Sequence, residues 1–313
     1  MNSFLVVIPL YNKSSTILRA IESVLAQVHI DFKILIIDDG STDDSYQQAS
    51  LVTNDHITLI KQENHGVSYT RNIGIKEAIE NKFDFVAFLD ADDYWMPDHL
   101  KQLDYSISKF PDATIIANNY KIKIGKRQFQ KTKLSLKNIE DSFLVEPFFQ
   151  YNYLNTVLIP SAICMSVKNN EPIYFDENLS HTEDIDFLIK AGLSAKVAFH
   201  KNPTVIYDET AGNKSSEVPI VKRSVTNFSK YEKEYPENLH LKKLIDINRF
   251  SIAIDYRLLN DIKNATLYQH QIDQNNLTKK QRTLLEMSSR QLKALKRTQR
   301  VLGNLGFRLR TGS

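Results

Sequence analysis

Three aspartates directly follow an apolar run. Asp90, Asp92 and Asp93 come after residues 85–89 (FVAFL), which predict a buried strand. Carboxylates this close together repel one another and therefore favour binding of a cation. An Asp-x-Asp pair offers hard oxygen ligands to Mg²⁺ or Mn²⁺, and the ion can in turn hold a diphosphate. The alternative is ordinary structure, either a solvated acidic loop or the start of a helix that Pro97 would open.

Polar residues also end the first two predicted strands. Pro9 and Tyr11 end the first, where a tyrosine can stack on a nucleobase or pack at a sheet edge. Asp38 and Asp39 end the second, before Gly40. An acid there commonly contacts a nucleotide, and Asp38 is expected to fix the loop, although Asp-Gly is also turn chemistry. In open α/β sheets such strand ends line the ligand crevice.

Two predicted helix starts complete the candidate site. Residues 64–74 open a helix whose first amides favour an anionic ligand. Arg71, one turn into it, either points at a base or diphosphate or is a surface cation. Glu183 and Asp184 open a later helix, either as catalytic groups or as first-turn acids behind a capping Thr182.

The elements that must position these groups alternate between strand and helix. Strands are predicted at residues 4–9, 32–37, 57–60 and 85–89, and helices at 15–26, 43–52 and 67–80. Repeated βαβ units imply a parallel sheet with right-handed crossovers. The loops after its strands gather at one edge, which brings the early motifs together.

The later chain is predicted to be more mixed. We expect a helix at 97–109, strands within 114–124, a hairpin or flexible loop at 121–133, a helix at 138–150, strands at 196–199 and 204–207, and helices from 221 onward. The sequence thus predicts a catalytic domain over residues 1–212 and a helical extension with a basic tail over 213–313.

In this order, the motifs resemble those of the family-2 glycosyltransferases, which have the GT-A fold. They are residues 6–12 (VVIPLYN), 36–43 (IIDDGSTD), 64–74 (NHGVSYTRNIG), the Asp-x-Asp unit and 183–187 (EDIDF). The resemblance covers roughly residues 3–210 and implies an α/β fold with a Rossmann-like, mostly parallel sheet. It also implies inverting transfer of a hexose or N-acetylhexosamine from a nucleotide sugar, expected to be a UDP-sugar, to an acceptor hydroxyl.

The resemblance assigns a role to each site residue. The donor would meet Pro9, Tyr11, Asp39, Arg71, Asp90 and Ala91. Asp39 would accept a hydrogen bond from the base, and Asp90 would meet the ribose or a metal-bound water. Asp92 would hold Mn²⁺ or Mg²⁺, which neutralises charge on the departing diphosphate. Asp184 would be the general base that takes the acceptor proton.

One segment departs from the family pattern. Many relatives carry Tyr-Arg-x-His after the last core strand, and that histidine can complete the metal site. This chain has residues 206–210 (IYDET) there instead. The third ligand stays open between Asp208, Glu209 and water, or the metal rests on Asp92 and the diphosphate alone.

Two other functions compete with this one. A sugar-phosphate nucleotidyltransferase would carry a glycine-rich loop with an arginine after the first strand, where this chain has residues 9–13 (PLYNK). A catalytically inactive sugar-nucleotide or glycan-binding module would not need the full set of acids. Intact Asp39, Asp90, Asp92 and Asp184 argue against such a module.

Composition and charge limit the class of protein and the cellular compartment to expect. The chain has 313 residues, 42% hydrophobic and 25% charged, as in ordinary globular proteins. Cys164 is the single cysteine, which fits a reducing cytoplasm. We expect no leader peptide and no membrane-spanning helix. Residues 279–313 carry a net charge of +9 against −6 for the rest, which favours a surface-binding tail over nucleic-acid recognition.

The basic tail suggests a contact with membrane. Its apolar residues at roughly helical spacing are Leu285, Leu292, Leu295, Val301, Leu302 and Leu305. A basic amphipathic helix can lie in an anionic lipid interface. That would place a cytoplasmic enzyme on the inner face of the membrane, beside a glycan or lipid-linked oligosaccharide acceptor. Alternatively, these leucines dock on the catalytic domain or on a partner subunit.

Overall fold

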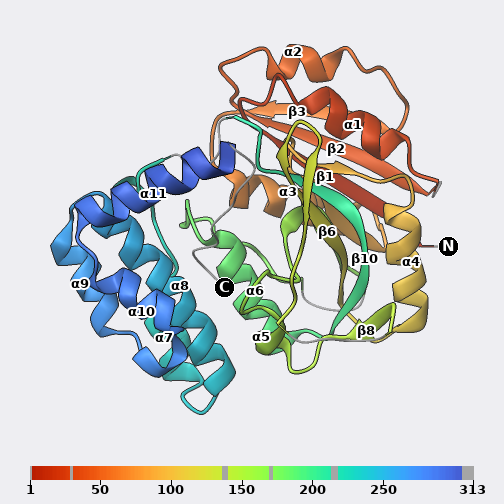
Figure 1. Ribbon diagram of the computed structural model, residues 1–313. Coiled ribbons are helices and arrows are strands. Elements are labelled where there is room, and N and C mark those ends of the chain that lie inside the picture. Colours follow the sequence, from red (N-terminus) through yellow and green to blue (C-terminus); the bar gives the residue numbers. More distant parts are fainter. Residues whose placement is uncertain (1, 29–30, 136–139, 169–171, 213–217, 305–313) are drawn as a thin grey trace. The chain divides into compact units, whose positions relative to one another are not determined.

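The chain folds into two compact units. The computed structural model describes residues 2–28, 31–135, 140–168, 172–212 and 218–304, with side chains up to residue 298 (Figure 1). The first unit contains residues 1–151, 155–217 and 224–226, and the second contains 152–154, 218–223 and 227–313. The chain therefore crosses between the units more than once.

A ten-stranded sheet forms the centre of the first unit. Its main order is β3-β2-β1-β4-β9-β6-β10-β5, with β7 paired to β6 and β8 to β10. The strands are β1 (Phe4–Leu10), β2 (Phe32–Asp39), β3 (Ile57–Gln62), β4 (Phe85–Phe88), β5 (Tyr94–Trp95), β6 (Ile115–Gly125), β7 (Gln128–Lys131), β8 (Ser142–Leu144), β9 (Ile163–Ser166) and β10 (Val197–Asp208). The four strands β3, β2, β1 and β4 are parallel, as are β6 and β10.

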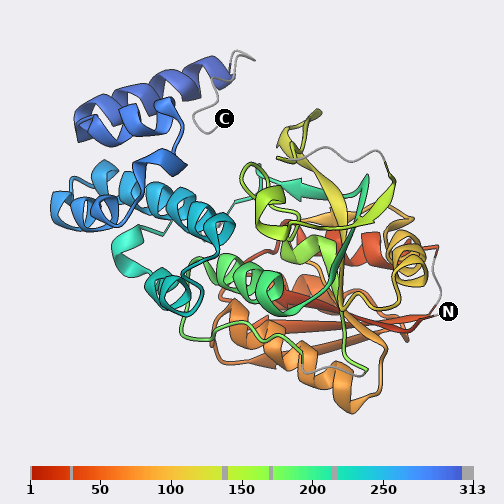
Figure 2. The same cartoon turned by 90° about the horizontal axis from the view of Figure 1, so that it is seen from below.

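Helices cover both faces of the parallel part, as the βαβ pattern predicts. They are α1 (Ile17–Leu25), α2 (Ser45–Ser50), α3 (Val67–Glu80) and α4 (His99–Lys109). Figure 2 shows α3 on one face of the sheet and α1 and α4 on the other. Val6 and Ile8 are buried in the cluster that contains the inner faces of α1 and α4. On the opposite face, a Cβ added to Gly74 of α3 would lie 2.4 Å from Val7 Cγ2, so close packing of α3 requires glycine.

Two predicted elements are wrong. In place of a helix at 138–150, β8 pairs with β10 and the short α5 (Phe148–Tyr151) follows, while residues 136–139 lie outside the described segments. The two predicted final strands are one strand, β10, whose register shifts between His200 and Val205. Pro203 cannot donate a ladder hydrogen bond, and the irregularity accommodates it without ending the strand.

Other local predictions are confirmed. The predicted helix at 67–80 is α3, and the basic segment after residue 120 forms the β6–β7 hairpin. Before β9, a 3₁₀ turn, η1 (Pro160–Ala162), brings Ser161 under the acidic turn that follows β4. A further helix, α6 (Glu183–Ser194), precedes β10.

The second unit is helical, as predicted from residue 221 onward. Its helices are η3 (Ile220–Lys222), α7 (Phe228–Glu234), α8 (Leu239–Leu258), α9 (Ile262–His270), η4 (Gln274–Asn276), α10 (Lys279–Glu286) and α11 (Ser289–Asn304). Leu285 and Leu292 are buried in its core beside Phe250, and Leu295 packs against them. These three leucines are therefore part of the core of the helical unit itself. Of the other predicted tail positions, Val301, Leu302 and Leu305 lie outside the described side chains.

A buried arginine links the helices of this unit. Arg249 on α8 is 1% exposed, and its guanidinium donates to both carboxylate oxygens of Glu232 on α7, at 2.6 and 2.5 Å. Asp246, fully buried, lies 3.7 Å from the same guanidinium.

Among the residues with described structure, no helix combines the length and hydropathy that a membrane crossing needs.

Candidate active site

Asp39 organises the loop that leads into α3. Its carboxylate is buried and accepts hydrogen bonds from the Gln62 side chain at 2.7 Å and from the backbone N–H groups of His65 and Gly66 at 2.9 and 2.8 Å. The Asn64 side chain donates to the Asp39 carbonyl oxygen at 2.8 Å. Asp39 thus holds together the carboxyl ends of β2 and β3 and the start of α3.

The expectation that Asp38 fixes this loop is wrong. Asp38 is fully buried, and its carboxylate makes no hydrogen bond to the described residues. Asp39 has the loop-fixing role because alternate residues of a strand point to opposite faces, and the face of Asp39 is the one that meets α3. Gly40 follows with φ +74°, and a Cβ there would lie 3.0 Å from the Asn64 nitrogen, so the turn requires glycine.

Arg71 joins two acidic motifs that are about ninety residues apart in the chain. Its side chain is 4% exposed, donates to Asp90 Oδ1 at 2.7 Å and lies 3.8 Å from Glu183 Oε1. The guanidinium also lies over the Phe175 ring, 5.0 Å from its centroid. Burial alone would lower the pKa of Arg71, but Asp90, Glu183 and Asp184 raise it. Arg71 is therefore a buried cation of the site, and the surface alternative is excluded.

The first turn of α6 carries two carboxylates whose pKa values are raised. Burial raises the pKa of Asp184, against the opposing effects of its hydrogen bond from the Ile185 N–H and of Arg71. Burial and the neighbouring Asp184 raise the pKa of Glu183, and Arg71 opposes the shift. A raised carboxylate pKa lies closer to working pH, which suits a group that must accept a proton.

The acidic turn after β4 places its three carboxylates in different surroundings. Asp90 bonds to Arg71, whereas Asp92, 19% exposed, forms an ion pair with Lys13 Nζ at 2.7 Å. Asp93 is buried and accepts a hydrogen bond from Ser161 Oγ at 2.5 Å. Burial, followed by the charges of Asp92 and Asp90, raises the pKa of Asp93 well above its usual range.

This turn is not a helix start. The next helix, α4, begins at His99, and Asp98 is its N-cap residue. Asp93 instead accepts a hydrogen bond from the N–H of Asp208, at 2.9 Å, and so ties the turn to the end of β10. The acidic turn is thereby fixed from beneath, and Asp90 and Asp92 stay partly exposed.

Asp208 is already committed to other partners. Its carboxylate, 2% exposed, accepts from Arg19 at 2.8 Å, from Lys123 at 2.7 Å and from the Thr210 N–H at 2.9 Å. Burial would raise the pKa of Asp208, but the bonds from Lys123, Thr210 and Arg19 lower it to about 2. The described residues contain no group of three His, Cys, Asp or Glu side chains arranged to hold a metal ion. Asp208 is therefore a poor third ligand.

The other predicted donor residues lie along the same strand ends. Tyr11 is 47% exposed, so it is not packed away at the sheet edge, whereas Pro9 is partly buried and Ala91 is buried. Sequence reasoning missed Lys13 and Arg19, because a lone cation in a loop or a helix signals no particular partner. Both belong to the segment between β1 and the end of α1 and contact acidic residues much later in the chain.

Two tyrosines near the acids were also missed. Tyr120 on β6 and Tyr207 on β10 have ring centroids 6.4 Å apart. Burial raises the pKa of both, and Asp184 adds to the shift for Tyr120. Their positions in β6 and β10 depend on the pairing of distant strands, which no local pattern shows. The raised pKa values favour the neutral phenols, which can donate hydrogen bonds.

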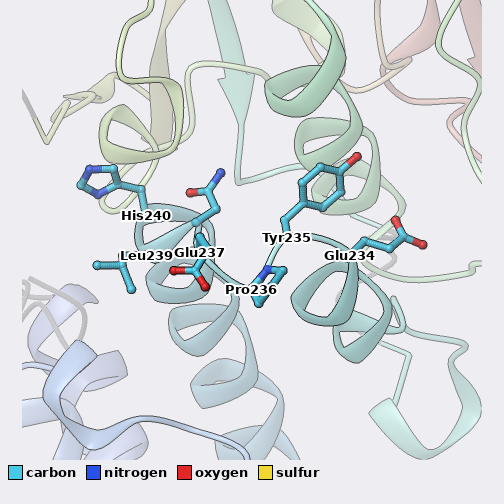
Figure 3. Close-up of a pocket in the computed structure, with 7 residues that line it drawn as sticks. Glu234, Tyr235, Pro236, Glu237, Leu239 and His240 are labelled. Atoms are coloured by element: carbon cyan, nitrogen blue, oxygen red, sulfur yellow. The ribbon is translucent and has the colours of Figure 1, made fainter.

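The second unit has a surface hollow that is separate from the candidate site residues. It has a volume of about 640 Å³ and is lined by residues 234–240, the turn between α7 and α8. Figure 3 shows Glu234, Tyr235, Glu237 and His240 spread along this turn rather than converging on one point. None of the candidate site residues lines it, and it offers no paired catalytic groups.

Comparison with known proteins gives a consistent picture. The family described as glycosyl transferase family 2 matches residues 5–170. The succinoglycan biosynthesis protein ExoW of Rhizobium meliloti is 33% identical over 209 residues, covering 63% of this chain and 65% of ExoW. An uncharacterized glycosyltransferase of Rickettsia felis is 36% identical over 176 residues, covering 56% of this chain but only 27% of that protein.

Solved structures of TarS from S. aureus share the fold. TarS 1–349 in complex with UDP-GlcNAc superposes with a TM-score of 0.57 at 22% identity, covering 84% of this chain and 72% of that one. The complex with UDP gives a TM-score of 0.55 at 19% identity, covering 91% and 90%. At these identities the likeness concerns the arrangement of strands and helices.

Proposed function

This chain belongs to glycosyltransferase family 2 and has the GT-A fold, and from that premise we propose that it is an inverting glycosyltransferase. The donor would be a UDP-sugar carrying a hexose or N-acetylhexosamine, and the acceptor a hydroxyl of a surface polysaccharide or lipid-linked oligosaccharide. One observation carries the proposal: Arg71 brings Asp90 and the Glu183–Asp184 helix start together at the carboxyl ends of the parallel strands.

Donor and acceptor classes are supported by the relatives. TarS has been captured with UDP and with UDP-GlcNAc, which supports a uridine nucleotide, with Tyr11 to stack on the base and Asp39 beside it. ExoW is named for succinoglycan biosynthesis, which supports a growing bacterial polysaccharide as acceptor. The matched segments leave large parts of some relatives uncovered, so the acceptor is inferred by class alone.

The proposed reaction uses Asp184 as general base. Its carboxylate accepts the proton of the acceptor hydroxyl while that oxygen forms a bond to the anomeric carbon. The bond from that carbon to the diphosphate oxygen breaks from the opposite side, and the nucleoside diphosphate leaves with the electron pair. Arg71 keeps positive charge beside Asp184 and so favours its ionised form before the proton is taken.

The side chains around Asp92 could hold a divalent ion in only one arrangement. Asp92 would be the protein ligand, and the remaining positions would be filled by donor phosphates and water, an arrangement that Mg²⁺ commonly adopts. Asp92 fits this because its carboxylate is partly exposed and pairs with Lys13, whereas Asp90 is held by the buried Arg71 and Asp93 and Asp208 are buried. Bound there, Mn²⁺ or Mg²⁺ would neutralise charge on the leaving diphosphate.

We expect UDP with Mn²⁺ to raise the thermal unfolding temperature, because a ligand that binds only the folded state stabilises it. EDTA should remove most of the shift, and Asp92→Asn should reduce it in the same way. Differential scanning fluorimetry with UDP, UDP-GlcNAc, GDP and TDP measures this. Equal stabilisation by UDP with and without EDTA would count against a metal-bridged diphosphate, and stabilisation without any turnover would favour an inactive binding module.

Lys13 supplies the matched variant for this experiment. Its ammonium lies 2.7 Å from Asp92 Oδ2 and competes with a divalent ion for the same carboxylate. Lys13→Met should therefore tighten Mn²⁺ binding, measured as free Mn²⁺ by electron paramagnetic resonance, whereas Asp92→Asn should weaken it. Unchanged Mn²⁺ affinity in both variants would place the metal elsewhere.

We also propose that the second unit holds the enzyme at the inner face of the membrane by charge alone. Exposed cations on α10 and α11 are Lys279, Lys280, Arg290, Lys293, Lys296 and Arg297. Because Leu285 and Leu292 are buried, the contact would be adsorption without insertion. Each cation near an anionic surface contributes about 1 kcal/mol.

Co-sedimentation with anionic and neutral vesicles measures this membrane contact. We expect binding to anionic vesicles at low salt and release at high salt, since the attraction is screened. Replacing Lys293, Lys296 and Arg297 by glutamate should abolish it without disturbing the buried leucines. A wild-type chain that ignores anionic vesicles at low salt would exclude the contact.

A further inference from the structure

The residue before the catalytic pair has an unusual backbone conformation. Thr182 directly precedes Glu183 and has φ +64°. Among the described residues, four non-glycine positions have positive φ, and Thr182 is the one that is β-branched. A β-branched side chain is disfavoured in this region, so surrounding contacts must hold it there.

Thr226 provides those contacts. Its N–H donates to Thr182 Oγ1 at 2.9 Å, and its hydroxyl donates to the Thr182 carbonyl oxygen at 3.0 Å. The two hydroxyl oxygens are 2.8 Å apart. Both residues are buried, so water does not compete for these bonds. The Thr182 side chain makes no capping hydrogen bond to α6. Its hydroxyl donates to the His181 carbonyl oxygen at 2.5 Å and accepts the hydrogen bond from the Thr226 N–H.

The same contact reaches the first turn of α6. The Thr182 carbonyl oxygen also accepts the hydrogen bond from the Asp186 N–H, at 2.9 Å. One oxygen therefore receives both the Thr226 hydroxyl and the first bond of the helix. A rotation about Thr182 would turn the segment that carries Asp184 and would change the 3.8 Å approach of Glu183 to Arg71.

Thr226 comes from a part of the chain that otherwise builds the helical unit. Residues 224–226 belong to the first unit, while 218–223 and the chain from 227 belong to the second. The N–H groups of Ser180 and His181 donate to the Ser224 carbonyl oxygen at 3.2 and 3.1 Å, so the short segment runs beside the approach to α6. Residues 224–226 are therefore a part of the first unit that comes late in the chain.

From this geometry we infer that Thr182 and Thr226 are positioning residues for Asp184. They would act through the backbone of α6 and touch neither donor nor acceptor. The inference rests on the proposed transfer reaction, since it assigns their effect to the base of that reaction. Displacing a reacting group by about 1 Å can cost about 10²-fold in rate, so loss of one hydrogen bond at this position should lower turnover.

Thr226→Val in the full chain tests this role. Valine keeps the size and the backbone N–H but removes the hydroxyl. With UDP release from UDP-GlcNAc and UDP-glucose as the assay, we expect kcat to fall about 10-fold while the donor KM stays unchanged. Thr226→Ser restores the hydroxyl and should restore kcat. A residue important only for stability would lower the unfolding temperature without this split between kcat and KM.

Ser180→Ala is the matched control. It removes the hydrogen bond that the Ser224 N–H donates to Ser180 Oγ at 2.9 Å, in the same pair of segments, but leaves the threonines intact. Its kcat should equal that of the wild type. If Thr226→Val does not fold, Thr182→Gly removes the hydroxyl–hydroxyl contact and the acceptor of the Thr226 N–H, and kcat should fall there too.

The outcomes separate the two proposals. Wild-type kcat in Thr226→Val, or in Thr182→Gly where that variant is used, overturns the positioning role while the transfer reaction stands. A wild-type chain that releases no UDP from either donor removes the proposed function, and the positioning role with it.

Discussion

Asp184→Asn should lower turnover by about 10²-fold or more while donor binding stays nearly intact. A positioned general base contributes about 10²–10⁴-fold, and asparagine keeps the shape of the side chain without accepting the proton. The stabilisation by UDP with Mn²⁺ should persist, because the base meets the acceptor rather than the donor. Initial rates of UDP release, with thermal shift on the same samples, measure both.

Asp186→Asn is the control for this substitution. Asp186 is two residues further along α6, is buried and pairs with Lys190 at 2.7 Å. We expect its turnover to stay near that of the wild type. If Asp184→Asn were near normal and Asp186→Asn inactive, the base would be Asp186.

The dependence of turnover on pH should also report on Asp184. Burial raises the pKa of Asp184 above its ordinary value of 3.8, and a base works only when ionised. Turnover should therefore fall on the acid side as pH drops through that raised pKa, at a pH above 3.8, and Asp184→Asn should lose this limb.

Arg249→Met should destabilise the second unit by about 3–5 kcal/mol, because it removes the buried cation from an ion-pair network. Glu232 loses two short hydrogen bonds and keeps its ion pair with Lys242. The fully buried Asp246 loses a nearby cation but keeps Lys242 and the hydrogen bonds from the Asp273 N–H and the Asn276 side chain. The free energy of unfolding can be measured by urea denaturation followed by far-UV circular dichroism. An unchanged midpoint would show that packing rather than the ion pairs holds α7 to α8.

The single tryptophan separates the response of the two units. Trp95 is buried in the first unit, so its fluorescence reports on that unit alone. In Arg249→Met, the circular dichroism transition should move further than the Trp95 transition. Arg257→Met is the matched control, since Arg257 donates to the neutral Gln269 side chain and the Met287 carbonyl, and its loss should cost about 1 kcal/mol.

Local patterns were sufficient for the parallel half of the sheet. Apolar runs bounded by polar residues located β1 to β4, and the segment at residues 67–80 was found as α3 without error. These elements are specified by their own residues and by short connections. The acidic turn, Asp39 and the start of α6 follow directly, since each lies at an element end.

The remaining features depend on partners far along the chain. β8 is three residues long and exists because β10 pairs with it, so its sequence alone favoured a helix. Asp93 is buried and accepts a hydrogen bond from the N–H of Asp208, which lies 115 positions later in the chain. Lys13 and Asp92 meet in the same way. Side chains that depend on such long-range neighbours carry no periodic signal.

The crossing segment at residues 224–226 has a consequence for recombination of this enzyme with its relatives. A chimera joined at residue 212 would receive the partner of Thr182 from the foreign half, even though every catalytic motif lies in the native half. The exchangeable piece is therefore longer than the piece that the motifs mark out. A junction placed after residue 226 keeps the threonine pair within one parent, and helical regions could then be exchanged while the segment that carries Asp184 keeps its native contacts.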